Sequence, residues 1–327
     1  MKRFVLLISG MIIVLLSGCG VSYMTINVQE PAQINLSNFK KIAVGDMTGW
    51  HAADVAGELT DRLVQSSRFE VLDRAHLDQM MQEYHLTMSG LVNQDSATQL
   101  GNLIGASALI FGRVEEYHYA ENTSHHTENV YDIVKWVPKK VGTKEVYTRN
   151  GKGTVEVSFT ITDLTTGRIL ISPSITQSAS TQTSVDNQPP APEINQEDLL
   201  ATARRQVISR FMDMITPHSV SAQVVLLNDS DIPELDRGID YAKNGSMNYA
   251  IENFISAVKN HQGNKNIDKA YFDLGVAYEY ANNFKDGLEM LNKAYSIKPD
   301  PRYANEISHC KSMEANYTKL QEQLQNH

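Results

Sequence analysis

The C-terminal part of the chain contains one helical pattern twice, and this repetition constrains the fold more than any other feature of the 327 residues. Small and large residues recur 37 positions apart, at Gly238 and Gly275, Tyr241 and Tyr278, Phe254 and Leu291, and Ala257 and Ala294. In each copy the small residues let two helices approach closely, and the large ones fill the space between them. The pattern therefore predicts two helical hairpins, at about 234–260 and 268–299.

These offsets resemble those of the tetratricopeptide repeat. The spacing exceeds the usual 34 residues because the linker at 261–266 holds about three extra residues. A further helical stripe over 304–324 predicts a capping helix, which two repeats would need because such arrays usually require three. We therefore expect an all-α helical-repeat domain over 231–327.

The first eighteen residues have the features of a removable export signal. Lys2 and Arg3 precede an apolar run at 4–16, which is shorter than the roughly 20 apolar residues that a membrane-spanning helix needs. The run ends in LSGC at 16–19, which resembles the bacterial lipobox, whose cysteine, here Cys19, receives a diacylglycerol. Related lipoproteins of the inner membrane usually carry Asp where Gly20 stands, so the resemblance implies an outer-membrane lipoprotein facing the periplasm. The alternative is a plain signal peptide followed by a chance cysteine.

Charge and cysteine content exclude several classes of protein. Removal of the leader changes the formal net charge from -9 to -11, and such acidity disfavours binding to nucleic acid. Two cysteines are too few for a disulfide framework or a cysteine-rich zinc site. The second one, Cys310, falls in a helical pattern, which favours a buried, inert thiol over a reactive one.

Between about 39 and 230, short strand-like runs alternate with helical ones, which predicts a mixed-sheet α/β domain. The expected strands are 41–46, 69–72, 108–114, 154–162, 169–171 and 220–227. The expected helices carry Val55, Ala56, Leu59 and Leu63; Leu77, Met80, Met81 and Tyr84; Leu100, Leu103 and Ile104 after an N-cap at Asp95; and Leu200, Ala203, Val207, Phe211 and Met214 within 197–215. Residues 19–38 are expected to be a tether, and the polar inserts near 117–150 and 172–192 to be exposed excursions.

Several blocks of this domain resemble the CsgG-like lipoproteins of curli secretion and their relatives. They are KKIAV at 40–44, the run at 57–63, RFEVLDR at 68–74, LGNLIGA at 100–106, and 163–170 with its Thr166-Gly167 turn. The resemblance implies a lipid-anchored periplasmic α/β domain. Some relatives assemble into rings, the curli member forms an outer-membrane secretion pore, and others are adaptors for envelope machinery with no chemistry of their own.

Two functions are compatible with this resemblance. The leading one is a periplasmic scaffold or adaptor of the outer membrane that supports envelope assembly or secretion through protein partners. The alternative is a ring-forming subunit of a curli-type outer-membrane secretion channel. A membrane-spanning strand needs about 9 to 11 residues with an apolar lipid face. Segment 172–192 is too polar for this, and the apolar run 130–137 faces the polar stretch 120–129, which favours the scaffold.

No residue pattern predicts catalysis, a cofactor or a metal site. His118, His125 and His126 lie in a polar stretch without a cysteine or a suitably spaced carboxylate, so solvated histidines are favoured over metal ligands. NGKG at 150–153 lacks the Lys-Ser/Thr ending of a phosphate loop and indicates a hairpin turn instead. We therefore expect a protein that is not an enzyme.

The first helices of the repeats are the predicted binding surface, a groove for a peptide or a partner helix. The residues expected to contact the partner are Lys243, Lys269, Phe272, Val276, Glu279 and Tyr280. The alternative is that this face docks within the chain, on the α/β domain or the capping helix.

Replacing Cys19 with Ala is expected to release the protein from membranes, because several acyl chains, each contributing about 0.8 kcal/mol per buried methylene, provide the anchor. Fractionation of cells into membrane and soluble fractions measures this. The Cys310→Ala variant is the matched control and should stay membrane-bound. Equal membrane association of both variants would contradict lipidation at Cys19.

Overall fold

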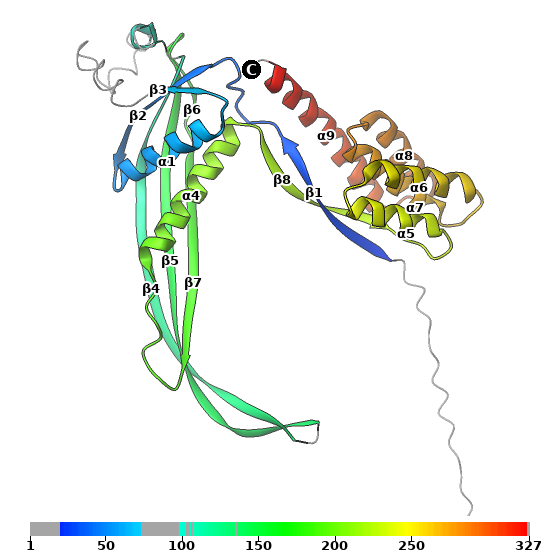
Figure 1. The fold of residues 1–327 in the computed structure, drawn as a ribbon, viewed down its shortest axis with the longest axis horizontal. Coiled ribbons are helices and arrows are strands. Elements are labelled where there is room, and N and C mark those ends of the chain that lie inside the picture. Colours follow the sequence, from blue (N-terminus) through cyan, green and yellow to red (C-terminus); the bar gives the residue numbers. More distant parts are fainter. Residues whose placement is uncertain (1–19, 73–97, 103–104, 106, 135, 326–327) are drawn as a thin grey trace, which may run out of the picture. The chain divides into compact units, whose positions relative to one another are not determined.

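The computed structural model describes residues 20–72, 98–102, 105, 107–134 and 136–325. These residues form two compact units (Figure 1). The sheet unit comprises 31–218 and the end of the chain from 320, and the helical unit comprises 20–30 and 219–319.

One six-stranded mixed sheet forms the sheet unit. The strand order is β3-β2-β4-β5-β6, and β7 also pairs with β5. The strands are β2 (Lys41–Gly49), β3 (Glu70–Leu72), β4 (Ala108–Val134), β5 (Val137–Asp163), β6 (Arg168–Ile171) and β7 (Ser174–Asp186). β2 is parallel to β3 and β4, whereas β5 is antiparallel to β4, β6 and β7. The predicted mixed-sheet α/β class is therefore confirmed.

The core of this unit lies between the sheet and the helices α1 (Ala52–Gln65) and α4 (Gln196–Ile215), which cover the same face (Figure 1). The predicted helical and alternating patterns supply its side chains, among them Val55, Ala56, Leu59 and Leu63 of α1, and Val155, Val157, Phe159 and Ile161 of β5. The ring of Phe159 stacks on that of Phe211 with centroids 4.1 Å apart. Truncating either ring to Ala would cost about 3–5 kcal/mol.

Helix α4 begins where a side chain satisfies its free backbone N–H groups. The Asn195 side chain accepts hydrogen bonds from the backbone N–H groups of Glu197 and Asp198. This cap fixes the start of the helix one residue before the predicted one. The buried face includes Leu199 rather than the predicted Leu200, which is half-buried.

The polar insert expected at 172–192 is not an irregular excursion, because residues 174–186 form β7. This strand pairs with β5 from Ser158 opposite Ser174 to Val146 opposite Asp186. Ile175 and Ala179 are buried in the core, while the intervening serines and threonines face solvent. The strand is half-buried, and its few apolar residues suffice because only alternate positions need to be apolar.

The expected tether also contains a strand. Residues 21–30 form β1 (Val21–Glu30), which pairs with β8 (His218–Leu227) in a separate two-stranded sheet. This pairing places residues 219–227, which we expected to belong to the α/β domain, in the helical unit.

Part of the predicted chain lies outside the described residues. The helix around Leu77, Met80, Met81 and Tyr84 is one such segment, and the leader with Cys19 is another. Of the helix predicted after Asp95, residues 98–102 are described and helical, and Leu100 is buried. Among the described helices, none has the length and apolar character needed to cross a membrane.

Five helices complete the helical unit, in an arrangement consistent with a helical repeat domain. They are α5 (Pro233–Lys243), α6 (Met247–Asn260), α7 (Ile267–Tyr280), α8 (Phe284–Ile297) and α9 (Pro301–Gln325). The last of them begins three residues before the predicted capping helix. Its final residues, from Leu320, belong to the sheet unit.

Glycines allow the paired helices to approach as the sequence predicts. A Cβ on Gly238 would overlap the Phe254 ring, and one on Gly275 would lie 2.7 Å from Leu291 Cγ. Real Cβ atoms do not approach other atoms this closely, so neither position accepts a side chain unless the facing side chain or helix moves.

The Gly275→Ala variant is expected to lower the free energy of unfolding by about 1–3 kcal/mol, because its Cβ would also lie 3.0 Å from the Leu291 backbone nitrogen and would push α7 from α8. Chemical denaturation measures the change. Gly263→Ala is the matched control, because no atom lies within 4 Å of the added Cβ. Equal stability of the two variants would contradict close packing of α7 on α8.

Candidate interaction site

The sheet unit carries a long hairpin formed by β4 and β5. The two strands pair from Ala108 opposite Asp163 to Val134 opposite Val137. β7 accompanies β5 only as far as Val146, so residues 137–145 of β5 pair with β4 alone (Figure 1). At about 3.3 Å per residue, this two-stranded part is roughly 30 Å long.

Exposed apolar side chains gather at the end of this hairpin. They are Tyr131, Ile133, Val134, Trp136, Val137 and Val141, which we call the hairpin tip. Trp136 is 95% exposed and adopts the left-handed conformation, with φ 66°, in the turn between the strands. Contiguous exposed apolar residues of this kind are typical of interaction sites.

The hairpin between the tip and the sheet is polar, and charged pairs link its strands. The Thr127 hydroxyl donates to the Glu145 carboxylate at 2.6 Å, and Lys144 forms ion pairs with Glu128 and Asp186. Hydrogen bonds from His126 and then Lys144 hold the pKa of Glu128 below its usual value. These contacts order the polar part of the hairpin, and they place no apolar side chains on its surface.

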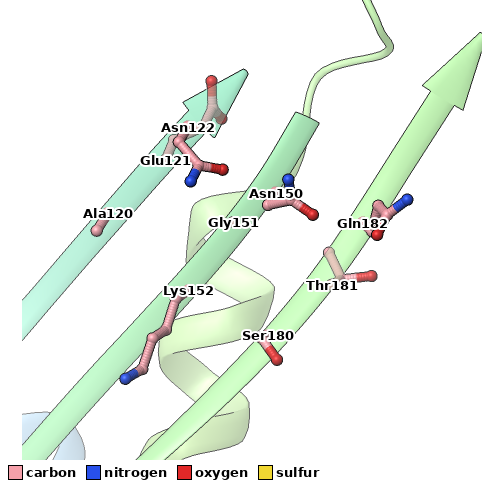
Figure 2. A pocket seen from close by; sticks show the side chains of 9 residues that line it. All are labelled: Ala120, Glu121, Asn122, Asn150, Gly151, Lys152, Ser180, Thr181 and Gln182. Atoms are coloured by element: carbon pink, nitrogen blue, oxygen red, sulfur yellow. The ribbon is translucent and has the colours of Figure 1, made fainter. Parts of the chain in front are cut away.

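A shallow hollow of about 570 Å³ lies on three neighbouring strands of the sheet unit. Its lining consists of cross-strand neighbours, Ala120, Glu121 and Asn122 of β4, Asn150, Gly151 and Lys152 of β5, and Ser180, Thr181 and Gln182 of β7. Figure 2 shows these residues on the strands, with a helix behind them. Amide and hydroxyl side chains line it, together with one carboxylate and one lysine. NGKG at 150–153, predicted to be a hairpin turn, lies within β5 instead.

The predicted partner-binding residues of the repeats are mostly buried. Lys269, Phe272, Val276 and Glu279 are each at most 4% exposed, Tyr280 is half-buried, and only Lys243 is exposed. Parts of the helical unit itself cover them. The Phe272 ring stacks on Tyr303 of α9 with centroids 4.9 Å apart, and the Lys269 ammonium contacts Asp229 at 2.6 Å. Partner binding by these residues stays a prediction, and at Phe272 and Glu279 it would require α9 to move.

The buried acidic side chains next to these residues, and their hydrogen-bond partners, were not predicted from the sequence. Asp273 is fully buried and accepts a hydrogen bond from the Leu227 backbone N–H at 2.8 Å. Burial raises its pKa well above the ordinary value. Burial also acts to raise the pKa of Asp229, but hydrogen bonds, the largest from Lys269, outweigh it and lower that pKa. The Tyr303 hydroxyl donates to Asp268 at 2.8 Å. Acidic residues on a helix are typical of a solvent-exposed face. The partners of these residues lie 35 or more positions away in the sequence, so the sequence pattern did not reveal that they are buried and paired.

Comparison with known proteins places the chain in a family. Residues 25–228 match the family described as the curli production assembly/transport component CsgG. The match covers more than half of the 327 residues, and the chain therefore belongs to this family, as its sequence blocks predict. Membership supports an outer-membrane-associated lipoprotein role. A search of curated proteins found none that matches the chain.

Solved structures with weak similarity include three bacterial proteins. The PelC dodecamer from Paraburkholderia phytofirmans is 13% identical, with 60% of this chain and 100% of that chain covered and a TM-score of 0.29. Lipoprotein GNA1162 from Neisseria meningitidis is 13% identical, with coverages of 53% and 98% and a TM-score of 0.30. The LpoB C-terminal domain from Salmonella enterica is 12% identical, with coverages of 44% and 87% and a TM-score of 0.28. At these TM-scores, their functions say nothing about this chain.

Replacing Lys269 with Met is expected to lower the free energy of unfolding by about 3–5 kcal/mol, because the buried Asp229 carboxylate would lose its ion pair. Lys243→Met, at an exposed position, should change it by less than about 0.5 kcal/mol. Urea denaturation of both variants measures the difference. Equal stabilities would show that the ion pair is not needed by the fold and would leave Lys269 available to a partner.

Proposed function

We propose that this chain is a lipid-anchored periplasmic scaffold of the outer membrane, which supports envelope assembly or secretion by holding partner proteins. The hairpin tip is the observation that carries the proposal. Membership of the curli assembly and transport family and the lipobox at Cys19 support the location.

Exposure of the apolar hairpin tip to water costs free energy, which a bound partner would recover. Each square ångström of apolar surface that a partner covers would contribute about 25 cal/mol. The polar part of the hairpin behind the tip would not be stabilised by contact with an apolar partner surface. A partner would therefore bind mainly at Ile133 and Trp136. A two-stranded hairpin is also marginally stable by itself, and a partner would hold it in place.

A ring-forming subunit of a curli-type secretion channel is the second candidate function, and the length of the hairpin favours it. Both β4 and β5 contain 27 residues, enough to cross a membrane. Their composition disfavours it, because the large exposed apolar residues of these two strands are confined to the tip. His125, His126, Thr127 and Glu128 are exposed within the part that would have to contact lipid. The scaffold is therefore the better supported function.

The helical unit would add a second binding region in this proposal. Lys243 and the exposed surfaces of α6 and α8 are accessible to periplasmic proteins, whereas α9 contacts Phe272 and Glu279 of the groove and Asp229 pairs with Lys269. A peptide or helix could enter the groove only in place of α9.

Photocrosslinking in cells tests the function directly. A photoreactive residue at Ile133 or Trp136 is expected to form an adduct with another envelope protein, and one at the exposed Asp61 of α1 serves as the matched control. Ile133→Ser and Trp136→Ser in the same chain should abolish partner capture while changing the unfolding free energy by less than about 0.5 kcal/mol each.

Two results would contradict the scaffold. Absence of a tip-specific adduct would overturn the proposed binding surface. A ladder of self-adducts, together with ion conductance by the purified protein in lipid bilayers, would replace the scaffold with the ring-forming channel.

A further inference from the structure

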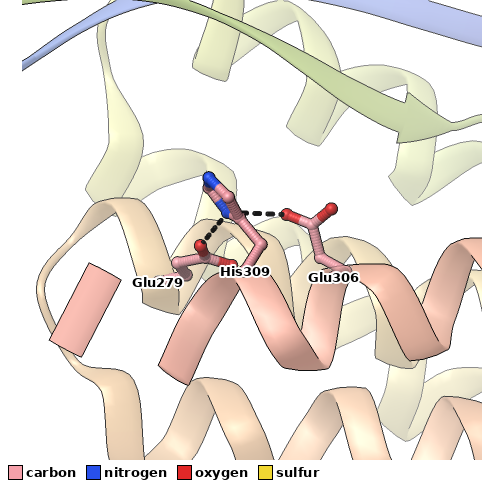
Figure 3. Close-up of side chains that lie close together, drawn as sticks. All are labelled: Glu279, Glu306 and His309. Atoms are coloured by element: carbon pink, nitrogen blue, oxygen red, sulfur yellow. Dashed lines mark hydrogen bonds and ion pairs between the residues drawn. The ribbon is translucent and has the colours of Figure 1, made fainter. Parts of the chain in front are cut away.

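Two residues of α9 and one of α7 bring a histidine and two carboxylates together. Glu306 and His309 are three positions apart and therefore share one face of α9, opposite Glu279 near the end of α7 (Figure 3). His309 Nδ1 lies 2.6 Å from Glu279 Oε1 and 3.8 Å from Glu306 Oε1. One possible ligand atom from each residue lies within 4.8 Å of the others.

In this cluster one histidine faces two carboxyl groups, one of them fully buried. Glu279 is fully buried, and its Oε2 accepts no hydrogen bond from the part of the chain that the structure describes. The His309 ring faces both carboxyl groups, and Glu30 of β1 adds further negative charge to its surroundings. A buried carboxylate with a free oxygen is costly unless it is paired or coordinates a metal.

We propose that Glu279, Glu306 and His309 bind a divalent transition-metal ion, with zinc as the best-fitting one. Imidazole nitrogen and carboxylate oxygen are both zinc ligands, with bonds of about 2.0–2.2 Å. Ligand atoms around a tetrahedral zinc ion are therefore about 3.4 Å apart, so the three side chains need only small rotamer adjustments. The Glu-x-x-His spacing on α9 is one that helical bundles use to present two metal ligands from one helix.

The exposure of the three residues fits this assignment. The His309 side chain is 46% exposed and that of Glu306 is 22% exposed, so an ion can reach them from solvent, while Glu279 provides a buried anchor. Three protein ligands leave a fourth position for water. Calcium and magnesium prefer oxygen ligands throughout, and the histidine disfavours them.

Neighbouring groups limit the ligand set to these three. Cys310 lies beside His309 in sequence, but its Sγ is directed to the Phe284 carbonyl oxygen at 3.9 Å. Burial, followed by the charges of Glu279 and Glu306, raises the pKa of its thiol to about 12. The Tyr280 ring lies 6.4 Å from the His309 ring and covers one side of it. Zinc bound here would connect α9 to α7 and hold the groove of the helical unit closed.

Zinc titration of the full mature chain, stripped with a chelator, tests the site. Isothermal titration calorimetry is expected to give one zinc ion per chain with micromolar or tighter affinity, and the melting temperature should rise with zinc. Substitution by cobalt should produce the visible absorption bands of a four-coordinate site with nitrogen and oxygen ligands.

Variants assign the ligands. Glu306→Gln and His309→Asn should each weaken zinc binding at least tenfold, and these partly exposed positions leave the buried Glu279 unchanged. His261→Gln is the matched control, because His261 contacts the Glu234 carboxylate at 2.9 Å in the same unit, and it should bind zinc like the unsubstituted chain. Absence of stoichiometric binding, or binding that Glu306→Gln and His309→Asn leave unchanged, would overturn the proposal.

Discussion

The pairing of β5 with strands on both of its edges is the constraint on which the sheet unit depends. Between Val146 and Ser158 this strand is hydrogen-bonded to β4 on one side and to β7 on the other. Its alternate side chains point to the α4 face, where Phe159 stacks on Phe211. Because the strand is fixed from three sides, β4 can extend beyond the body of the sheet with its register set. The core therefore determines where the hairpin tip lies, because the tip is at the far end of the same two strands.

The helical unit shows a different constraint, the need to pair polar groups that are buried together. Asp273 meets the end of β8 through the Leu227 N–H, and Lys269 meets Asp229 just beyond that strand. On the other side of α7, Glu279 meets His309 of α9. These directional contacts specify which segments fill the groove, whereas apolar packing alone would accept several arrangements.

The sequence was most informative where a local period determines burial. The alternation at 154–162 and the helical stripe from Val55 to Leu63 both predict the buried faces correctly, because each depends only on neighbours along the chain. Residues 172–192 were misjudged because β7 owes its strand structure to the register with β5, and serine and threonine alone do not reveal a partner. Lys269 and Glu279 present charged side chains on a helix, a pattern typical of an exposed face. Their partners lie about 30 to 40 residues away, and no spacing rule connects them. Separation along the sequence also concealed the cluster of Glu279 with Glu306 and His309. The adjacent histidines at 125 and 126 form a more obvious sequence pattern, but they are exposed.

The length of the hairpin of β4 and β5, which sets how far the hairpin tip extends from the sheet, can change only in certain steps. Successive side chains of a strand point to opposite faces, so inserting one residue in one strand exchanges the faces of everything beyond it. Changes that preserve the orientation of Tyr131 and Trp136 must add or remove two residues in each strand, which alters the reach in steps of about 7 Å. An odd number of inserted residues could be accommodated at the register shift between Val130 and Tyr131, because a bulge already offsets the two strands there. The distance at which this chain presents its apolar tip is thus adjustable in discrete increments, without any change to the core that supports it.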